Sequence, residues 1–386
     1  MSKYPTVKLG DVCIIERGGS PRPINKFITK DPNGINWIKI GDTSADSMYI
    51  TKTAEKIIPE GVLKSRQVKK GDFILSNSMS FGRPYILNID GCIHDGWLLI
   101  RDINDIFEKQ FLYYYLSSET VYANLKQMAV GGVVNNLNSN KVRSLMVPVL
   151  KKEDQVKICN KLNKITTVIQ QRKQQLSKLD ELAKSRFIEM FGDNHSELVP
   201  LEQLCDFIRN GANIRQSKGS GGYPITRIET ISNNVFNLDR LGYAGITTLD
   251  KYENYILKNG DILVSHINSE KYLGRAVQYK GQQKIIHGMN LLCVRPKETT
   301  IATFLEYYLR SKPTKEYISK ITKKAVNQAS FSVSDYKKLP VMNISKNECM
   351  AFNSFIEQLD KSKFRIKKSL EKLEMTYKAL LQEYFG

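Results

Sequence analysis

Two histidines and two aspartates recur in this chain and are the first residues to test for catalytic chemistry. His94 lies in IHDGWLLIR and His287 in IHGMNLLCVR, while Asp72 and Asp261 follow glycine in KKGDFILSNS and KNGDILVSHI. A catalytic histidine needs a nucleophile beside it, and no partnering serine or cysteine constellation recurs with either copy. We therefore expect a structural or binding role for the histidines, and aspartates that cap a strand or turn.

Small and polar residues gather in several segments of both halves: 18–23, 76–84, 131–141, 209–215, 226–230, 265–271 and 325–332. In such loops arginine can read guanine, asparagine can read adenine, and serine can contact either bases or phosphates. The candidate residues of the first half for contact with bases or phosphates are Ser20, Arg22, Lys39, Ser76, Asn77, Ser78, Ser80, Arg83, His94, Asn135, Asn136, Asn138 and Lys141. Those of the second half are Arg209, Asn213, Arg215, Arg227, Ser265, His266, Asn268, Lys271, Arg275, His287, Asn327 and Gln328.

Motifs of catalysis and metal binding are missing from the sequence. It has no G-x-x-x-x-G-K-[ST] phosphate loop, no G-x-G-x-x-G after a strand, and no Asn/Asp-Pro-Pro-aromatic tetrapeptide like that of amino-methyltransferases. The six cysteines are scattered singly, so we expect reduced, mostly buried thiols and no metal site. A nuclease or methyltransferase stays the alternative, and methyl transfer by the purified chain would establish it.

The charge of the chain is strongly positive, with 58 Lys and Arg against 39 Asp and Glu and a formal net charge of +19. Such a balance indicates a polyanionic partner, either nucleic acid or an anionic membrane surface, or else a solvated basic surface. No run of about 18 apolar residues occurs, and the N-terminus lacks the apolar core of a signal peptide. We therefore expect a soluble, cytoplasmic protein.

The two halves of the chain repeat each other at an offset of about 190 residues. VKLGDVC ending at Cys13 matches VPLEQLC ending at Cys205, and FGRPYIL matches LGRAVQY, which pairs Arg83 with Arg275. FLYYYLSS matches FLEYYLRS further on. The halves keep their apolar framework and differ in the polar loops, as expected if each copy reads a different sequence. The pattern indicates a duplication of two large units.

Each unit begins with about 150 residues in which short apolar, β-branched runs alternate with Gly, Asn and Pro, which is typical of a mixed α/β domain. We predict strands at Trp37–Ile40, Asp72–Leu75 and Trp97–Ile100, and a helix that starts near Phe111. The predicted class is α+β, with two tandem α/β domains at 1–150 and 194–343, each followed by a long helix.

The two long helices are predicted at 151–193 and 344–386, where apolar residues alternate at spacings of three and four. The seam residues are Ile158, Leu162, Ile165, Ile169, Leu176, Leu179, Phe352, Ile356, Leu359, Ile366, Leu370 and Leu373. Arg172 and Lys363 interrupt the seams, and Ser345 with Glu348 form a capping box. We predict that the two helices pair as a coiled coil, a spacer of roughly 55–60 Å. Packing of each helix on its own domain is the alternative.

Tandem α/β modules separated by long helices, with the K-[KN]-G-D-[FI]-[IL] strand and the F-x-x-[ML]-F-G-like ending, resemble the specificity subunit of type I restriction–modification systems. The resemblance covers essentially the whole chain. It implies that residues 1–150 and 194–343 are target-recognition domains, each reading half of a split, asymmetric site on double-stranded DNA. It also implies that the two long helices pack as an antiparallel coiled coil. In this family a proline and a glutamine often mark the start of each long helix. Pro148 and Gln155 fit this pattern, but the second copy has Met342 and Cys349.

The resemblance also implies partners. Two modification subunits resembling an N6-adenine methyltransferase would bring S-adenosylmethionine, and two restriction subunits, ATP-dependent translocases with a nuclease domain, would bring ATP and Mg. The chain itself is then expected to hold no cofactor and to have no catalytic site. A specificity chain for a fused methyltransferase–nuclease is also compatible with the pattern, and so is a coiled-coil scaffold without DNA readout. Gly386 directly follows its helix, so we expect no further segment that returns to the N-terminus.

Overall fold

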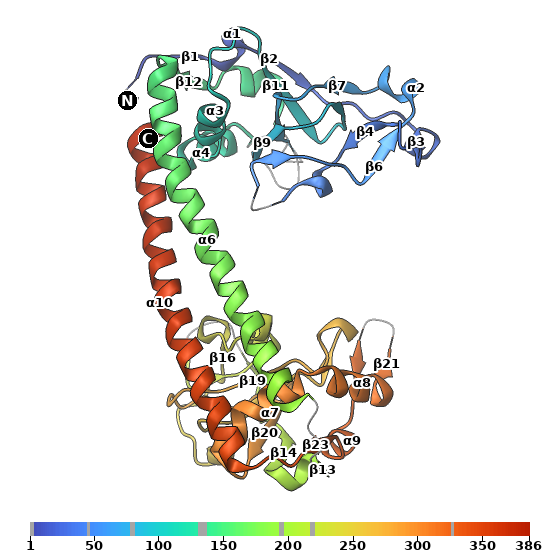
Figure 1. The fold of residues 1–386 in the computed structure, drawn as a ribbon, viewed down its shortest axis with the longest axis vertical. Coiled ribbons are helices and arrows are strands. Elements are labelled where there is room, and N and C mark those ends of the chain that lie inside the picture. Colours follow the sequence, from blue (N-terminus) through green and yellow to red (C-terminus); the bar gives the residue numbers. More distant parts are fainter. Residues whose placement is uncertain are drawn as a thin grey trace. The chain divides into compact units, whose positions relative to one another are not determined.

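The fold is that of a computed structural model (Figure 1), which describes residues 4–44, 47–77, 82–129, 137–192, 197–216, 221–325 and 328–386. The chain forms two compact units, residues 1–174 with 367–386 and residues 175–366. Each of the two long helices therefore contributes one part to each unit. Within the described residues, no helix has both the length and the apolar character needed to cross a membrane.

The first unit contains two five-stranded sheets. In the central sheet the order is β2 (Cys13–Arg17), β11 (Trp97–Asp102), β8 (Phe73–Ser76), β9 (Pro84–Leu87), β5 (Tyr49–Ile50). In the outer sheet it is β3 (Ile28–Thr29), β6 (Glu55–Ile57), β4 (Ile35–Ile38), β10 (Gly91–Ile93), β7 (Arg66–Val68). Three helices follow, α3 (Lys109–Leu116), α4 (Glu119–Ala129) and α5 (Ser139–Arg143), with short helices α1 (Leu9–Val12) and α2 (Pro59–Val62) before them. Pairings are antiparallel except β5–β9 and β4–β10.

The central sheet of this unit is buried on both faces, which explains the continuous apolar runs in its strands. Phe73 and Leu75 of β8 belong to one apolar cluster, which also includes residues of α3. Ile74 belongs to another cluster, which includes Ile38 and Ile93 from the outer sheet. Alternate side chains along a strand point to opposite faces, so a single strand joins two cores.

The second unit repeats this framework with a smaller sheet. The order is β14 (Cys205–Asn210), β20 (Leu292–Pro296), β17 (Ile262–Val264), β19 (Ala276–Gln278), all antiparallel. Beside it are a pair, β15 (Pro224–Ile225) and β16 (Gly242–Tyr243), and a sheet of β18 (Ile267–Asn268), β22 (Ala329–Ser330) and β21 (Lys323–Lys324). The helices are α7 (Ala302–Leu309), α8 (Lys312–Ile321) and α9 (Val333–Lys337).

In each unit the first strand pairs with the strand that precedes the long helix. β1 (Thr6–Lys8) pairs with β12 (Met146–Pro148), and β13 (Leu198–Pro200) pairs with β23 (Pro340–Met342), both antiparallel. A tyrosine hydroxyl donates to the last strand in both units, from Tyr115 to the Met146 carbonyl and from Tyr308 to the Pro340 carbonyl. The domain is closed by the same contacts in both copies.

The long helices are α6 (Lys152–Phe191) and α10 (Lys346–Phe385), and they pack against each other within each unit. In the first unit Lys161 Nζ lies 3.3 Å from Tyr384 Oη, and Lys173 forms an ion pair with Glu374 at 3.6 Å. In the second unit Lys363 pairs with Asp180 at 2.6 Å. Higher residue numbers of one helix meet lower numbers of the other, so the pair is antiparallel.

Every predicted seam residue in these helices is buried or half-buried: Ile158, Leu162, Ile165, Ile169, Leu176, Leu179, Phe352, Ile356, Leu359, Ile366, Leu370 and Leu373. The first core includes Ile158 and Leu162 of α6 together with Phe385 of α10. The second core includes Phe187 of α6 together with Phe352 of α10. Each helix therefore packs both on a globular domain and on the other helix, which combines the two arrangements considered from the sequence.

The helix starts differ between the copies. Ser345 and Glu348 form the predicted capping box, because the Ser345 N–H donates to Glu348 Oε2 at 3.1 Å and the Glu348 N–H donates to Ser345 Oγ at 3.4 Å. Gln155 in α6 is buried instead. Its Oε1 accepts from the Glu108 N–H at 2.7 Å, and its Nε2 donates to the Ile106 and Leu150 carbonyls. This amide joins the helix to the loop before α3.

The predicted fold class is confirmed: both domains mix helices with sheets and both are followed by a long helix. The three predicted strands are found at Ile35–Ile38, Phe73–Ser76 and Trp97–Asp102, and the helix near Phe111 at Lys109–Leu116. The compact units do not divide the chain at the predicted boundaries of 150, 193 and 343. They divide it within the two long helices, after residues 174 and 366, because each half of a long helix packs with the globular domain that it contacts. Those boundaries stay a prediction.

Candidate nucleic-acid interface

Four of the candidate residues in the first unit surround Asp95, a residue that the sequence did not single out. Ser20 Oγ donates to Asp95 Oδ1 at 2.8 Å, and Arg22 Nη2 lies 3.4 Å from Asp95 Oδ2. Asn77 Nδ2 donates to the Asp95 carbonyl at 2.9 Å. Arg22 is 81% exposed and Asp95 is 43% exposed, so solvent reaches this carboxylate and its arginine.

The fourth residue, His94, is held as a neutral framework group. Its Nδ1 accepts from the Gly96 N–H at 2.8 Å, and its Nε2 lies 3.3 Å from the Ile40 N–H. Burial lowers the pKa of His94, although the neighbouring Asp95 opposes the shift. The Ser20 hydroxyl donates to the carboxylate and not to the imidazole, so no serine nucleophile is activated here.

The hydrogen bond from Ser20 lowers the pKa of Asp95, so this carboxyl is ionised at neutral pH. An ionised carboxylate accepts hydrogen bonds and can hold a guanidinium in one orientation. Asp95 is therefore the centre of the polar cluster of the first unit, defined here as Ser20, Arg22, Asn77, His94 and Asp95.

The other described candidates of the first unit lie outside this cluster. Lys39 pairs with Glu55, and the guanidinium of Arg83 lies 5.4 Å from the ring centre of Tyr85. Ser76 is buried and its hydroxyl accepts from the Arg83 N–H. Asn138 caps α5 by accepting from the backbone N–H of Lys141. Lys141 itself donates from Nζ to the Met128 carbonyl.

In the second unit the candidates gather around the sheet of β18, β22 and β21. Asn268 Nδ2 donates to Ser265 Oγ at 3.2 Å, and β18 pairs with β22. Lys271 and Arg275 both lie close to the exposed Tyr272, 5.6 and 4.8 Å from its ring centre. Gln328, next to β22, is exposed. Two cations and an exposed aromatic ring therefore lie near the hairpin of β21 and β22, in which β21 consists of Lys323 and Lys324.

Both described histidines of the second unit are buried and neutral. Burial lowers the pKa of His266 and of His287 to about 4. His287 Nε2 lies 2.8 Å from the Leu291 carbonyl, which can only accept, so this nitrogen is the protonated one. The ring of His266 packs against Phe331, and its Nδ1 has no hydrogen-bond partner among the described residues. Neither ring faces a nucleophile in the described structure.

The arginines and Asn213 of the second unit differ in exposure. The guanidinium carbon of Arg209 lies 4.1 Å from the ring centre of Phe207 and 5.0 Å from that of Tyr255. Arg227 lies 3.4 Å from Glu229. Arg215 is exposed to solvent, and so is Asn213.

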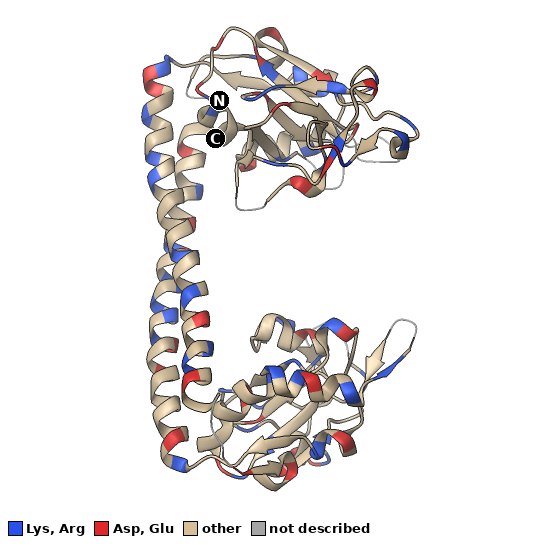
Figure 2. Ribbon diagram, turned by 45° about the vertical axis from the view of Figure 1, so that its right-hand side comes forward, with Lys and Arg blue, Asp and Glu red and all other residues tan. Residues whose placement is uncertain are grey.

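Exposure divides the candidate residues into two groups. Ser76, Asn77, Ser265, His266 and His287 are buried and serve the framework in this conformation. The side chains that solvent reaches most freely belong to Arg22, Asn138, Asn213, Arg215, Lys271 and Gln328. Ser78, Ser80, Asn135, Asn136 and Asn327 lie outside the described residues. Figure 2 shows lysine and arginine positions in both units and along both long helices.

The repeated aspartates are framework residues whose partners the sequence did not reveal. Asp72 accepts from the Lys69 N–H at 2.8 Å and Asp261 from the Lys258 N–H at 2.7 Å, which confirms their expected place in a turn. Each also pairs with an arginine on the neighbouring strand of its sheet, Arg101 or Arg295. In the same turns Gly71 and Gly260 have φ of +94° and +97°, which glycine adopts without strain.

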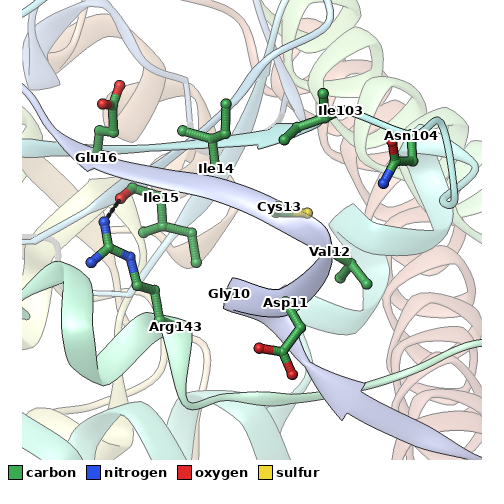
Figure 3. Close-up of a pocket in the computed structure, with 10 residues that line it drawn as sticks. All are labelled: Gly10, Asp11, Val12, Cys13, Ile14, Ile15, Glu16, Ile103, Asn104 and Arg143. Carbon is green, nitrogen blue, oxygen red and sulfur yellow. Dashed lines mark hydrogen bonds between the residues drawn. The ribbon is translucent and has the colours of Figure 1, made fainter.

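A pocket of about 290 Å³ in the first unit is lined by residues that include Asp11, Cys13, Glu16 and Arg143 (Figure 3). It lies along β2, and the Arg143 guanidinium that lines it already donates to the Ile15 carbonyl at 2.7 Å. Burial raises the pKa of the Cys13 thiol to about 12, with the charge of Asp102 adding to the shift. A thiol with so high a pKa is a poor nucleophile. All six cysteines are buried and free, as predicted.

Comparison with known families matches the chain to the type I restriction modification DNA specificity domain, over residues 1–180 and again over residues 194–375. A Methanocaldococcus jannaschii protein named as the specificity subunit of the type I restriction enzyme MjaX is 36% identical over 191 residues. The match covers 49% of this chain and 45% of that relative, so the chain spans about half the length of the relative.

Two solved structures share the fold. A chain from a study of complex assembly and conformational transition of the type I R-M system has a TM-score of 0.62 and 16% identity, covering 100% of this chain and 99% of that one. The S subunit of a type I restriction–modification system from M. genitalium has a TM-score of 0.53 and 14% identity, covering 100% and 96%. Both structural matches extend over both copies of the repeat.

Proposed function

Because this chain belongs to the type I restriction modification DNA specificity family, we propose that its two units read the two halves of a split, asymmetric site on double-stranded DNA. The observation that carries the proposal is the match of the family to each half of the chain separately. The two units share a framework and differ in their exposed polar residues. Two readers of this kind select two different short sequences.

The chain contributes recognition to the complex, and partner subunits contribute catalysis. In this proposal two modification subunits methylate adenine at N6 with S-adenosylmethionine, and two restriction subunits use ATP and Mg to translocate and cut DNA. Support comes from the functional side chains, because the histidines, cysteines and Ser20 described above are all engaged or buried in the framework. The paired helices α6 and α10 carry exposed apolar residues, including Ile188, Phe364 and Met375, on which partners can dock.

In this proposal the basic charge accounts for the affinity for DNA, and the exposed polar residues account for the sequence preference. A net charge of +19 favours contact with phosphates, which weakens as salt rises. Sequence preference comes instead from side chains that reach base edges. DNA binding by the assembled complex should therefore fall steeply with salt while its sequence preference is kept.

The test is to express the chain with a modification subunit encoded beside it and to map N6-methyladenine across the host DNA. One split motif, with two defined halves around a fixed unspecified gap, is the expected result. Methylation that does not depend on the chain would favour the scaffold hypothesis. Methyl transfer by the chain alone would establish the enzyme hypothesis. A partner polypeptide that both methylates and cleaves would identify the fused system.

A further inference from the structure

The two units place one glycine at the same point of the fold, directly after the first strand of the main sheet. A Cβ on Gly18 would lie 2.0 Å from the His94 carbonyl oxygen, and a Cβ on Gly211 would lie 2.3 Å from the His287 carbonyl oxygen. Any side chain there would collide with the backbone. Both glycines therefore pack against the carbonyl of the histidine in their unit. The next residues are bonded differently, since the Gly19 N–H donates to the Ile93 carbonyl and the Ala212 N–H donates to the His287 carbonyl.

An arginine follows each of these glycines at the same distance along the chain. Arg22 is the fourth residue after Gly18, and Arg215 is the fourth residue after Gly211. Both arginines are exposed. The common place of the two glycines and the equal spacing make them equivalent positions of the repeat, although the sequences between them differ.

The residue that follows the histidine differs between the units. In the first unit it is Asp95, whose carboxylate lies 3.4 Å from Arg22 and is itself held by Ser20. In the second unit it is Gly288, which has no carboxylate and whose N–H donates to Thr226 Oγ1 at 2.9 Å. Arg215 has no ion pair with any residue in the described ranges. In the first unit a carboxylate therefore helps to orient the arginine. In the second unit the orientation of Arg215 depends on the group that it binds.

A carboxylate beside an arginine favours contact with a base over contact with a phosphate. A DNA phosphate is an anion and is repelled by Asp95, whereas the O6 and N7 acceptors of guanine carry no formal charge. Asp95 also lies 3.4 Å from one nitrogen of the planar guanidinium and so favours some of its orientations, and bidentate contact with a guanine edge requires an oriented fork. The cluster of the first unit is suited to reading a guanine.

Resting on the proposed function, we propose that Arg22 and Arg215 are equivalent specificity-determining residues, one in each unit, and that Asp95 positions Arg22 to read a guanine. Arg22 sets one G·C pair in the half-site of the first unit. Arg215 occupies the equivalent position in the second unit and determines discrimination in the other half-site. Asp95 acts through Arg22 and does not contact the DNA itself.

The experiment maps N6-methyladenine with complexes that contain the full chain and its modification subunit, for wild type, Arg22→Ala, Arg22→Lys and Arg215→Ala. Arg22→Ala should reduce discrimination at one G·C pair of one half-site by roughly 5- to 150-fold, with the other half-site unchanged. Arg22→Lys should lose the same discrimination, because lysine keeps the charge but not the fork. Arg215→Ala should change only the opposite half-site, which makes each variant the control for the other.

Asp95→Asn tests the positioning role separately. It should weaken preference at the base pair that Arg22→Ala affects, and it should add nothing when combined with Arg22→Ala. A loss spread over all base pairs and over the other half-site would indicate damage to the fold and would overturn this role. Tryptophan fluorescence reports on folding of the first unit, because Trp37 and Trp97 both lie there.

Several results would overturn the inference. Wild-type discrimination retained by Arg22→Lys, or a uniform loss of affinity with a salt slope reduced by about 1 in Arg22→Ala, would identify a phosphate contact. An unchanged motif in Arg22→Ala would place Arg22 outside the interface. If the wild-type complex produced no split motif, the proposed function itself would fail, and the inference with it.

Discussion

The first unit surrounds its histidine turn with charged groups, whereas the second unit fills the same place with a glycine and a threonine. Asp95 in the first unit is ionised and partly exposed, but Gly288 in the second is buried against Thr226. Beneath both turns the framework is the same: a glycine against the histidine carbonyl, a buried aspartate–arginine pair and a tyrosine that closes the domain. A duplicated fold keeps the groups that hold its backbone and varies those that face solvent.

The buried ion pairs should show the largest difference between the units. In the second unit the side chains of Asp261 and Arg295 are 1% and 15% exposed, against 4% and 26% for Asp72 and Arg101 in the first. Asp261→Ala should cost about 3–5 kcal/mol, because it leaves a buried guanidinium without its carboxylate. Asp72→Ala should cost less, since water can reach Arg101. Urea unfolding followed by hydrogen exchange in each unit measures both, and equal losses would contradict the comparison.

The start of α6 should depend on Gln155 more than the start of α10 depends on Cys349, the residue at the equivalent place. Gln155→Ala should cost roughly 2–3 kcal/mol, because it leaves the Glu108 N–H and two carbonyls without their partner. Cys349→Ala removes one sulfur atom and should cost less. Unfolding midpoints of the two variants give the measurement, and a larger loss for Cys349→Ala would reverse the expected order.

Acid should destabilise the second unit more than the first. Burial lowers the pKa of His266 and His287 to about 4 in the folded chain, from an ordinary value of 6.5. Stability is therefore complete above pH 6.5 and is lost as the pH falls towards 4, because the unfolded chain binds the protons first. At pH 5 the loss is about 2 kcal/mol for each histidine.

Hydrogen exchange corrected for intrinsic rates, at pH 7 and pH 5, measures this effect in each unit. His266→Gln is the control, since it should remove about half of the pH-dependent loss in the second unit. Tryptophan fluorescence follows the first unit, where His94 has its pKa lowered by burial but partly restored by Asp95. An equally steep loss of stability in the first unit between pH 7 and pH 5 would contradict the expected difference between the units.

The smallest expected effect concerns the helix caps. Ser345→Ala should cost about 1 kcal/mol by removing the acceptor of the Glu348 N–H at the start of α10. In α6 the first turn has acidic residues, Glu153 and Asp154, and Asp154→Asn should cost about 0.3–1 kcal/mol. Exchange rates of amides in the first turn of each helix give the comparison. Faster exchange in both helices from either single substitution would show that the ends are coupled.

Most of the fold could be predicted from the sequence because its signals are local. The seam from Ile158 to Leu179 has helical period, and the apolar strand Trp97–Ile100 is bounded by a turn, so the elements were found within two residues of their ends. The repeat also located the turn at Asp72 and Asp261. The smaller sheet of β18, β22 and β21 was not predicted, because its strands are two residues long and carry no periodic pattern.

The polar cluster could be predicted only in part. Ser20, Arg22 and Asn77 were selected by residue type, but Asp95 is 75 residues from Ser20 and becomes its neighbour only in the folded unit. The same holds for Arg101 and Arg295, whose aspartate partners lie in the turns that precede another strand of the sheet. Burial was also hidden, since Asn77 and His266 follow equivalent strands and look like loop residues in the sequence. The type of a residue indicates which contacts its side chain can make. Its position relative to the folded sheet determines whether that side chain reaches solvent.

The most direct test of two independent readers is to replace residues 194–343 with the corresponding segment of another member of the family and to map N6-methyladenine with the same modification subunit. We predict that one half of the split motif changes while the other half and its methylated adenine stay the same. A motif that changes in both halves, or in neither, would contradict recognition of separate half-sites by the two units.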